Sequence, residues 1–259
     1  MRIATFNING IKARGDVLAR WLDESKPDVA VLQEIKSIDA NVPRALIEDR
    51  GYHLETHGQK GFNGVAILSR TPLTDVRRGL PGDDGDEQAR WIEATVGDAG
   101  GLRVCGLYLP NGNPAPGPKF DYKLAWMARM QAHAKTLLTQ EVPLVLAGDY
   151  NVIPQPDDAA RPEAWAKDAL FLPESRAAFR RLLALGFYDA VRLRHPESGI
   201  YSFWDYQAGA WSRNDGIRID HLLLSPQAAD RLRDAWVETG PRGWDKPSDH
   251  TPVWADLDL

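Results

Sequence analysis

Apolar residues along the chain fall mostly into short runs, either continuous or alternating with polar residues, and both patterns are typical of β-strands. The predicted strands span residues 3–8, 28–34, 52–57, 64–70, 91–96, 102–109, 143–149, 201–206, 217–225, 235–239 and 252–257. Several of these runs follow one another with no helical segment between them. Because a purely parallel sheet needs a crossover after each strand, this pattern favours two packed sheets that are mostly antiparallel.

Helical spacing of apolar residues occurs between some of the strands. Residues 15–25, 119–140 and 175–185 each carry an apolar face, and the third segment stops at Gly186. Helices of this kind pack one face on a sheet and expose the other. The predicted fold class is therefore α/β, with two mostly antiparallel sheets packed together and helices outside, a four-layer α-β-β-α sandwich.

The chain has no internal repeat, no low-complexity tract and no obvious linker. Its Pro/Gly-rich pieces at 81–87, 110–118 and 154–162 are short and lie between apolar runs, so they read as loops. A length of 259 residues is compatible with one large α/β domain. We expect a single catalytic domain over residues 1–259.

Composition is ordinary for a globular protein, with 43% hydrophobic and 26% charged residues. No apolar run approaches the roughly 18 residues that span a bilayer, and the N-terminus lacks the pattern of a signal peptide. The single cysteine, Cys105, lies in an apolar run and is expected to be a small core residue. These features predict a cytoplasmic protein. A net charge of −5 argues mildly against a nucleic-acid partner, although the local field decides that question.

Polar side chains suited to metal or phosphate binding lie repeatedly at the ends of the apolar runs, in most cases just after a run and in the last case just before one. They are Asn7, Glu34, Tyr108, Asp149, Asn151, Asp220, Asp249 and His250. Each alone has a plain structural interpretation as a turn or cap residue. Taken together they are hard to explain as independent turns, and they predict a site on one rim of the sheets.

Carboxylate and amide oxygens are hard ligands, and no Cys/His zinc spacing occurs, so the pattern favours Mg²⁺ or Mn²⁺ over zinc. A hard divalent ion beside a histidine suits phosphate ester hydrolysis. In such a site Asp149 would activate water as general base, and Asp220 would orient His250. Asn151 and Tyr108 would donate to the phosphate in the transition state.

Several short motifs in the chain are similar to those of a known protein family. TFNING at 5–10, LQE at 32–34, YLPNG at 108–112, GDYN at 148–151, RIDH at 218–221 and SDH at 248–250 resemble, in order and spacing, the exonuclease/endonuclease/phosphatase superfamily. NGIKAR at 9–14, LQEIK at 32–36, YLPNGN at 108–113, PKFDYK at 118–123 and YSFWDY at 201–206 resemble its exonuclease III branch of abasic-site DNA endonucleases. The resemblance covers residues 3–257 and implies a DNase I-like fold.

The resemblance also implies roles. Catalytic roles fall on Tyr108, Asp149, Asn151, Asp220 and His250. Metal-associated positions are Asn7, Glu34, Asp149, Asn151, Asp249 and His250. Substrate-binding positions are Lys119, Phe203, Trp204 and Ile219. Phe203 and Trp204 resemble an aromatic wall for a flipped, base-less deoxyribose, but Trp204 is equally well explained as core. His221 is expected to point away from Asp220 and to be structural.

The leading hypothesis is a Mg²⁺-dependent DNA repair nuclease that cuts 5′ to abasic sites, acts as a 3′→5′ exonuclease and trims blocked 3′ ends. Mn²⁺ is expected to substitute. The partner would be double-stranded DNA with abasic sites or blocked 3′ ends. The protein is expected to be a monomer and not to associate with a membrane. Because the net charge is acidic, binding of DNA phosphates would require a local rim of basic residues around the site. Its candidates are Arg14, Lys36, Arg77, Arg78, Lys119, Lys123, Arg213 and Arg242.

Two alternative functions differ from this hypothesis, one in its substrate and the other in lacking catalysis. A phosphodiesterase or phosphatase of the same superfamily would act on lipid headgroups or small phosphoesters, but no membrane-facing apolar hairpin is apparent. A noncatalytic nucleic-acid-binding module would have lost some of Glu34, Asp149, Asn151, Asp220 and His250, and all five are present.

Overall fold

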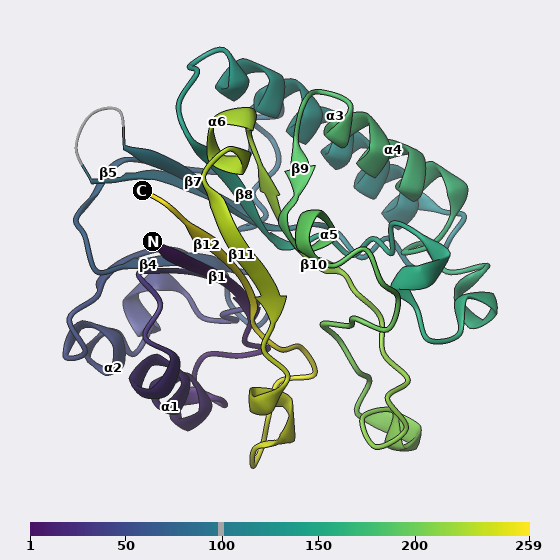
Figure 1. Cartoon of the computed structure of the whole chain (residues 1–259), viewed down its shortest axis with the longest axis horizontal. Helices are drawn as coiled ribbons and strands as arrows, with labels where there is room; N and C mark the ends of the chain where they lie inside the picture. Colours follow the sequence, from purple (N-terminus) through teal and green to yellow (C-terminus); the bar gives the residue numbers. More distant parts are fainter. Residues whose placement is uncertain (98–100) are drawn as a thin grey trace.

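Two six-stranded sheets packed face to face form the centre of the protein, as the computed structural model of residues 1–97 and 101–259 shows (Figure 1). The first sheet has the order β11(Leu232–Val237)-β12(Val253–Leu257)-β1(Arg2–Asn7)-β2(Val29–Gln33)-β4(Val65–Ser69)-β3(His53–His57). The second has the order β5(Leu73–Arg78)-β6(Trp91–Val96)-β7(Leu102–Tyr108)-β8(Leu144–Asp149)-β10(Asp220–Leu224)-β9(Tyr188–Asp189). The pairs β1–β2 and β7–β8 are parallel and the other described pairs are antiparallel, which confirms the predicted sheet type.

Helices pack around the two sheets. They are α1(Gly15–Ser25), α2(Arg44–Glu48), α3(Pro118–Leu138), α4(Pro173–Leu183), α5(Ala190–Arg194) and α6(Pro226–Ala229). Helices α1 and α2 lie against the first sheet, and α3 and α4 lie against the second (Figure 1). The predicted four-layer sandwich is therefore confirmed, and the three long helices lie where the apolar spacing placed them.

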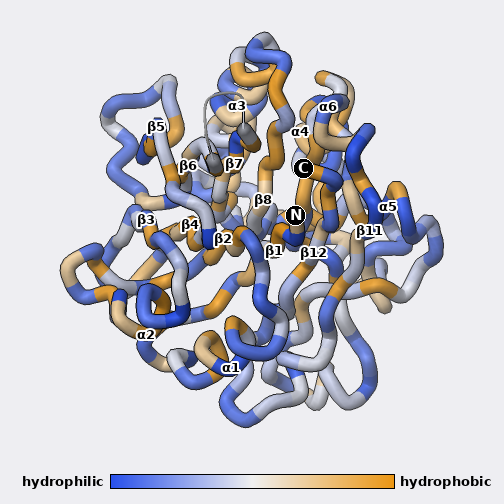
Figure 2. The backbone as a smooth tube through the Cα atoms, turned by 60° about the vertical axis from the view of Figure 1, so that its left-hand side comes forward, coloured by the Kyte–Doolittle hydropathy of each residue, from blue (hydrophilic) through white to orange (hydrophobic). Residues whose placement is uncertain are grey.

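Three apolar layers follow from this arrangement, and the hydrophobic residues of the strands lie inside (Figure 2). Strand residues alternate between layers because successive side chains point to opposite faces. In β10, Leu222 and Leu224 enter the layer between the sheets, whereas Leu223 packs under α3 and α4. The same alternation turns Asp220 toward the space between the sheets and His221 toward the helices. Cys105 is fully buried under α3, as expected.

The sequence-based strand pattern missed the two-residue strand β9 and was wrong at two further places. The segment 201–206 is not a strand, and only Phe203 forms isolated bridges, to Ile217 and His250. Tyr201 and Trp204 in this segment are buried by side-chain packing rather than as part of a sheet, whereas Tyr206 is exposed. Strand β5 was missed because its residues are mostly polar and partly exposed at a sheet edge. Within the described part of the chain, no helix is both long and apolar enough to cross a membrane.

Candidate active site

The two parallel strand pairs bring polar residues from both sheets to the same edge. Asn7 ends β1, and Glu34 directly follows β2, the parallel neighbour of β1. Tyr108 and Asp149 end the parallel strands β7 and β8 opposite each other. The carboxyl ends of parallel strands lie at one edge of a sheet, and here the edges of the two sheets meet. The amide of Asn7 consequently reaches across the sheets to the carboxylate of Asp149, with Nδ2 3.0 Å from Oδ2.

Glu34 is held by contacts on both sides of its carboxylate. Asn7 Nδ2 donates to Oε1 at 2.9 Å, and Lys36 Nζ lies 2.8 Å from Oε2. Burial opposes ionisation, but the hydrogen bonds from Lys36 and Asn7 outweigh it and lower the pKa of Glu34. Its backbone has a left-handed φ of 50°, which is uncommon for a glutamate and is fixed by a 2.7 Å hydrogen bond from Gly10 N to its carbonyl. Glu34 is thus an ionised carboxylate on a constrained turn.

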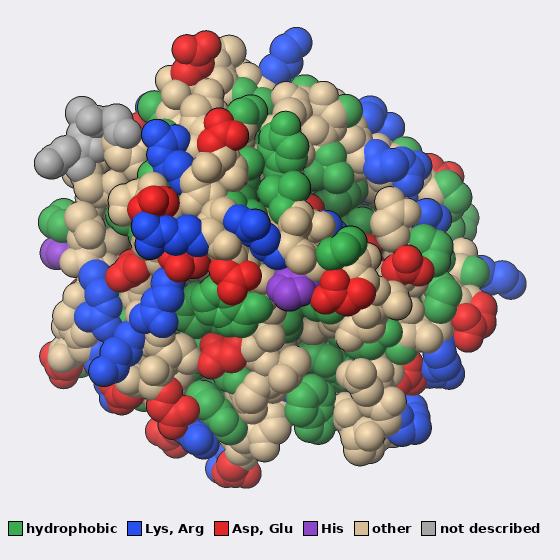
Figure 3. Space-filling model, viewed as in Figure 1, with side chains coloured by type: hydrophobic (Ala, Val, Ile, Leu, Met, Phe, Trp, Pro, Cys, Tyr) green, Lys and Arg blue, Asp and Glu red, His purple; other side chains and the backbone are tan. Residues whose placement is uncertain are grey.

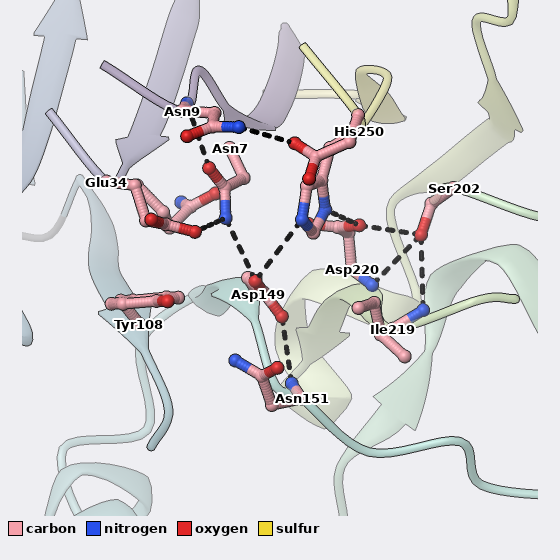
Figure 4. A network of polar contacts seen from close by, with 12 residues as sticks. Asn7, Asn9, Glu34, Tyr108, Asp149, Asn151, Ser202, Ile219, Asp220 and His250 are labelled. Carbon is pink, nitrogen blue, oxygen red and sulfur yellow. Dashed lines mark hydrogen bonds and ion pairs between the residues drawn. The ribbon is translucent and has the colours of Figure 1, made fainter. Parts of the chain in front are cut away.

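Asp149 lies at the centre of the cluster (Figure 4). The backbone N–H of Asn151 donates to its Oδ1 at 2.9 Å, closing a turn in which Asn151 has a left-handed φ of 46°. Burial, together with the nearby negative charge of Asp220, raises the pKa of Asp149 to about 7, although His250 and these hydrogen bonds oppose the shift. A carboxylate with such a pKa is suited to accept a proton near neutral pH.

His250 and Asp220 form a buried pair, with Nδ1 2.8 Å from Oδ2. The same oxygen accepts a 2.6 Å hydrogen bond from the hydroxyl of Ser202. Burial disfavours the imidazolium, but the charges of Asp220 and Asp149 outweigh burial and raise the pKa of His250 to about 10. The other ring nitrogen of His250 lies 3.7 Å from Asp149 Oδ2. At neutral pH the histidine is therefore a cation beside Asp149.

The SDH loop is anchored by its serine. Ser248 Oγ donates to the carbonyl of Asn7 at 2.7 Å, and the N–H of His250 donates to the same hydroxyl at 3.2 Å. Asp249 accepts from Asn9 Nδ2 at 2.9 Å. These contacts place Asp249 and His250 at the end of β1, immediately before the final strand β12.

Tyr108 lies next to the carboxylates with its ring under a guanidinium. The Arg90 guanidinium carbon is 4.9 Å from the ring centroid, and Arg90 Nη1 donates to the Tyr108 carbonyl at 3.2 Å. Burial, Glu34 and Asp149 raise the pKa of the phenol well above its usual range. The hydroxyl therefore stays protonated and can donate a hydrogen bond.

A cavity of about 220 Å³ opens over these residues. Its lining consists of Glu34, Tyr108, Asn111, Asn113, Asp149, Asn151, Trp165, Asp168, Leu170, Phe203, Ile219, Asp249 and His250. Phe203 and Ile219 lie in its wall as predicted, and the Phe203 ring packs against His250 with centroids 4.9 Å apart. Six of the eight strand-end residues also line it. Asn7 and Asp220 lie behind the lining, Asn7 bonded to Glu34 and Asp149 and Asp220 bonded to His250.

Two predicted substrate contacts lie elsewhere. Trp204 is only 1% exposed, donates to Asn214 and packs edge-on against Trp211, so it is a core residue outside the lining of this cavity. Its neighbour Phe203 faces the cavity because the two side chains point in opposite directions. Lys119 is exposed at the start of α3, also outside the lining.

Two residues predicted for a basic rim are buried. Arg242 is 6% exposed and donates to the Trp204 carbonyl at 3.0 Å. Lys123 has no exposed surface, and its ammonium contacts the carbonyls of Asn111 and Asn151. Burial lowers the pKa of Lys123 to about 7, against the influence of Asp149 and Asp168. Neither side chain is positioned to contact DNA.

Comparison with known proteins agrees with this geometry. A model of the endonuclease/exonuclease/phosphatase family matches residues 4–250. The chain belongs to this family. Exodeoxyribonuclease III of Haemophilus influenzae is 36% identical over 266 residues, with 99% of this chain and 100% of the relative covered.

Two solved structures extend the family comparison. An AP endonuclease from Archaeoglobus fulgidus is 37% identical with a TM-score of 0.95, and both chains are covered completely. The 3′ phosphatase NExo from Neisseria, solved with a product DNA hairpin, is 39% identical with a TM-score of 0.96, again over both complete chains. These matches assign the chain to the exonuclease III branch of the family and confirm its fold.

The cluster in this family member fits a divalent metal ion. Ligand atoms of Glu34, Asp149 and His250 all lie within 4.8 Å of one another. Asp220 Oδ1 is buried and has no hydrogen-bond partner among the described residues, which marks an excess of acceptors. Asn7 turns its NH₂ group, rather than its oxygen, toward the carboxylates, because Asn9 N donates to the Asn7 oxygen at 3.0 Å. In this arrangement Asn7 links two carboxylates as a donor.

Several residues that complete the site were not singled out by the sequence. Asn9 and Ser202 orient site carboxylates, and Asn111, Trp165 and Asp168 line the cavity. Asn111 and Ser202 lie inside the motifs YLPNGN and YSFWDY, where a role could have been sought. Trp165 and Asp168 lie in a loop without any hydrophobic period, and only tertiary structure brings them to the cavity.

Proposed function

We propose that the protein is a Mg²⁺-dependent DNA repair nuclease that hydrolyses the phosphodiester 5′ to abasic sites and removes blocking groups or nucleotides from 3′ ends. The observation that carries the proposal is the convergence of Glu34, Asp149 and His250 at one end of the space between the sheets, with ligand atoms within 4.8 Å. The AP endonuclease and 3′ phosphatase among the similar structures support the same substrate class.

The roles of the residues follow from their protonation. Asp149, whose pKa is raised to about 7, accepts the proton of the attacking water. His250 is held as a cation by Asp220, so it neutralises negative charge on the phosphate rather than acting as the base. Two groups with pKa values displaced in this way take distinct acid and base roles. Water forms the new bond to phosphorus, and the P–O3′ bond breaks to leave a 3′-hydroxyl.

Neutral donors complete the transition-state contacts. The Asn151 amide gives one N–H to the Leu109 carbonyl at 2.9 Å, which leaves its second N–H for a phosphate oxygen. The protonated Tyr108 hydroxyl supplies another donor. Donors fixed in this way stabilise developing charge without reorganising during the reaction.

Glu34 is the principal candidate to hold the metal ion, with Asp149 and Asp249 close by and Asn151 as a further predicted contact. Asn7, whose NH₂ group faces the carboxylates, and the protonated His250 would have to reorient or lose a proton to join the predicted ligand set. The oxygen-rich donor set favours Mg²⁺, with Mn²⁺ as a substitute. When bound, the ion would neutralise the phosphate and stabilise the leaving oxygen. Lys36 now occupies one side of Glu34, so its ammonium has to share or yield that carboxylate when a cation enters.

The DNA partner requires cations around the cavity despite the acidic net charge. Lys36 contacts Glu34 in the cavity wall, Arg14 contacts Asn9, the partner of Asp249, and Lys119 is exposed at the start of α3. Arg77 and Arg78, also predicted for the rim, are paired with Asp75 and Glu55. On the face seen in Figure 3, basic and acidic side chains are interspersed. We therefore propose few, local phosphate contacts. A monomeric single domain over residues 1–259 and a cytoplasmic location stay predictions.

A panel of phosphoesters tests the substrate class. It would contain a duplex with one abasic-site analogue, the undamaged duplex, a 3′-phosphorylated hairpin and a soluble inositol phosphate, each with Mg²⁺. We expect incision of the abasic duplex and dephosphorylation of the hairpin, at rates exceeding those for the inositol phosphate by at least about 100-fold, which corresponds to about 2.7 kcal/mol of transition-state discrimination. Hydrolysis of the inositol phosphate alone would refute the DNA proposal and support a small-phosphoester enzyme.

A further inference from the structure

A lysine is buried behind the active-site cavity. Lys123, in the second turn of α3, has 0% exposed surface and ranks among the largest fully buried side chains. Lysines are seldom fully buried unless their charge has partners. Its Nζ donates to the carbonyl of Asn151 at 2.5 Å and to the carbonyl of Asn111 at 3.0 Å. One ammonium therefore joins the loop after β7 to the turn after β8.

Both loops need this link for their geometry. Asn151 has a left-handed φ of 46°, a conformation that requires support from its surroundings. Gly112 has a φ of 91°, and a Cβ at this position would lie 2.6 Å from Lys123 Cδ. The glycine therefore permits the close approach of the loop to the lysine stem. This contact is a structural reason for a glycine after Asn111 in the YLPNGN motif.

The link fixes the side chain of Asn151 indirectly. Asn111 Nδ2 donates to Asn151 Oδ1 at 3.1 Å, and the Leu109 carbonyl accepts from Asn151 Nδ2 at 2.9 Å. Both partners belong to the segment that Lys123 ties down. A shift of this segment would rotate the Asn151 amide and misdirect its remaining N–H.

We propose that Lys123 is a positioning residue for hydrolysis, which acts by holding the carbonyls of Asn111 and Asn151 together so that the Asn151 amide faces the phosphate. The inference deepens the proposed function and rests on it for its kinetic test. It gives Lys123 no contact with DNA, unlike an exposed lysine of a basic rim.

Substitution of Lys123 by Met tests the proposal because Met keeps an apolar stem and lacks N–H donors. We expect kcat on the abasic duplex to fall about 10- to 100-fold while KM changes less than about threefold, since an interaction acting in the transition state is lost. Met130→Ala is the matched control, because Met130 is buried on the same helix in the core under α3 and α4. It should lower the melting temperature and leave kcat within about threefold.

Chemical rescue separates the ammonium from simple packing. Propylammonium should restore part of the kcat lost in Lys123→Ala, whereas 1-propanol at the same concentration should not. If the Met variant does not fold, Lys123→Gln replaces it. The Gln side chain ends one atom short, so at least one carbonyl stays unpaired and kcat should fall by more than about threefold.

Amide hydrogen exchange supplies a readout independent of activity. Residues 109–113 and 150–152 should exchange faster in the folded Lys123 variants than in the wild type, and Met130→Ala should lack this local pattern. Unchanged kcat together with unchanged exchange in these segments would overturn the proposal. If the wild type cleaves none of the DNA substrates, the proposed function fails, and the exchange pattern alone decides whether Lys123 holds the two loops.

Discussion

Asp220 and His221 are neighbours on β10, yet they belong to two charged regions with opposite properties. Asp220 joins His250, Asp149 and Glu34 at the end of the space between the sheets. His221 faces the helix side, where Arg218 bridges Asp158 and Asp189 at 2.7 Å each. We call the first group the acidic cluster and the second, consisting of Asp158, Asp189, Arg192, Arg218 and His221, the balanced cluster.

The balanced cluster contains equal numbers of opposite charges. Two arginines meet two aspartates, and His221 accepts from Arg218 and donates to the Val152 carbonyl as a neutral ring. Burial and Arg218 lower the pKa of His221 to about 4. The hydrogen bonds among these residues each pair a donor with an acceptor, so the cluster needs no further ligand.

The acidic cluster lacks this balance. Among the described residues, the ion pairs of the four carboxylates of Glu34, Asp149, Asp220 and Asp249 are to His250 and Lys36 alone. Buried charge alone therefore does not identify a functional site. An excess of negative charge next to a cavity indicates one, because a bound cation is needed to balance it.

Replacing each histidine by Gln should separate the two clusters most strongly. His250→Gln should lower the incision rate by about 10³-fold, because the cation next to the phosphate is lost. His221→Gln should stay within about threefold of the wild type, since Gln can still accept from Arg218 and donate to Val152. Initial rates at saturating Mg²⁺ measure both. Equal losses in the two variants would contradict the division.

Replacing one aspartate from each cluster by Asn should have different effects on the stability of the fold. Asp158→Asn should destabilise the fold by about 3 kcal/mol, because Arg218 and Arg192 lose a buried counter-charge. Asp149→Asn should not destabilise it at pH 8, since the raised pKa of Asp149 shows that its ionisation opposes folding. Urea unfolding of the metal-free proteins compares them. A larger loss in Asp149→Asn would show that Asp149 is a structural charge.

Acid should unfold the balanced cluster through His221. The folded-state pKa of about 4 lies below the unfolded value of 6.5, so the unfolded chain binds more protons between these pH values. The stability is fully present above pH 6.5 and is lost as pH falls toward 4, by up to about 3 kcal/mol. Unfolding curves of wild type and His221→Gln over this range isolate the contribution. Parallel pH dependences would remove His221 as its cause.

Metal binding should stabilise only the acidic cluster. Mg²⁺ at ten times its Kd should raise the free energy of unfolding by about 1.4 kcal/mol. Glu34→Gln should weaken this effect, while Glu55→Gln, which removes a surface partner of Arg78, should retain it. Urea unfolding with and without Mg²⁺ at constant ionic strength measures the gain. The same gain in both variants would exclude Glu34 as the main ligand.

Sequence patterns predicted the sandwich because buried strands and amphipathic helices carry strong periodic signals. They also predicted the acidic cluster, since its members lie at the ends of buried runs, with Asp249 and His250 just before the last one. They failed where tertiary packing decides orientation. Nothing local distinguishes Phe203, which faces the cavity, from Trp204, which faces the core. Lys123 looked like a surface lysine because its two carbonyl partners lie in other segments. Trp165 and Asp168 come from a loop without periodicity.

The most direct test of the acidic cluster as the hydrolytic site is incision of a duplex with one abasic-site analogue. It would be measured for wild type and Asp149→Asn, with Mg²⁺ and with EDTA, and the Asp158→Asn variant would serve as the control from the balanced cluster. We predict incision 5′ to the lesion by the wild type and by folded Asp158→Asn, only with Mg²⁺, and at least about 10³-fold slower incision by Asp149→Asn. Undiminished incision by Asp149→Asn, or incision in EDTA, would contradict the account.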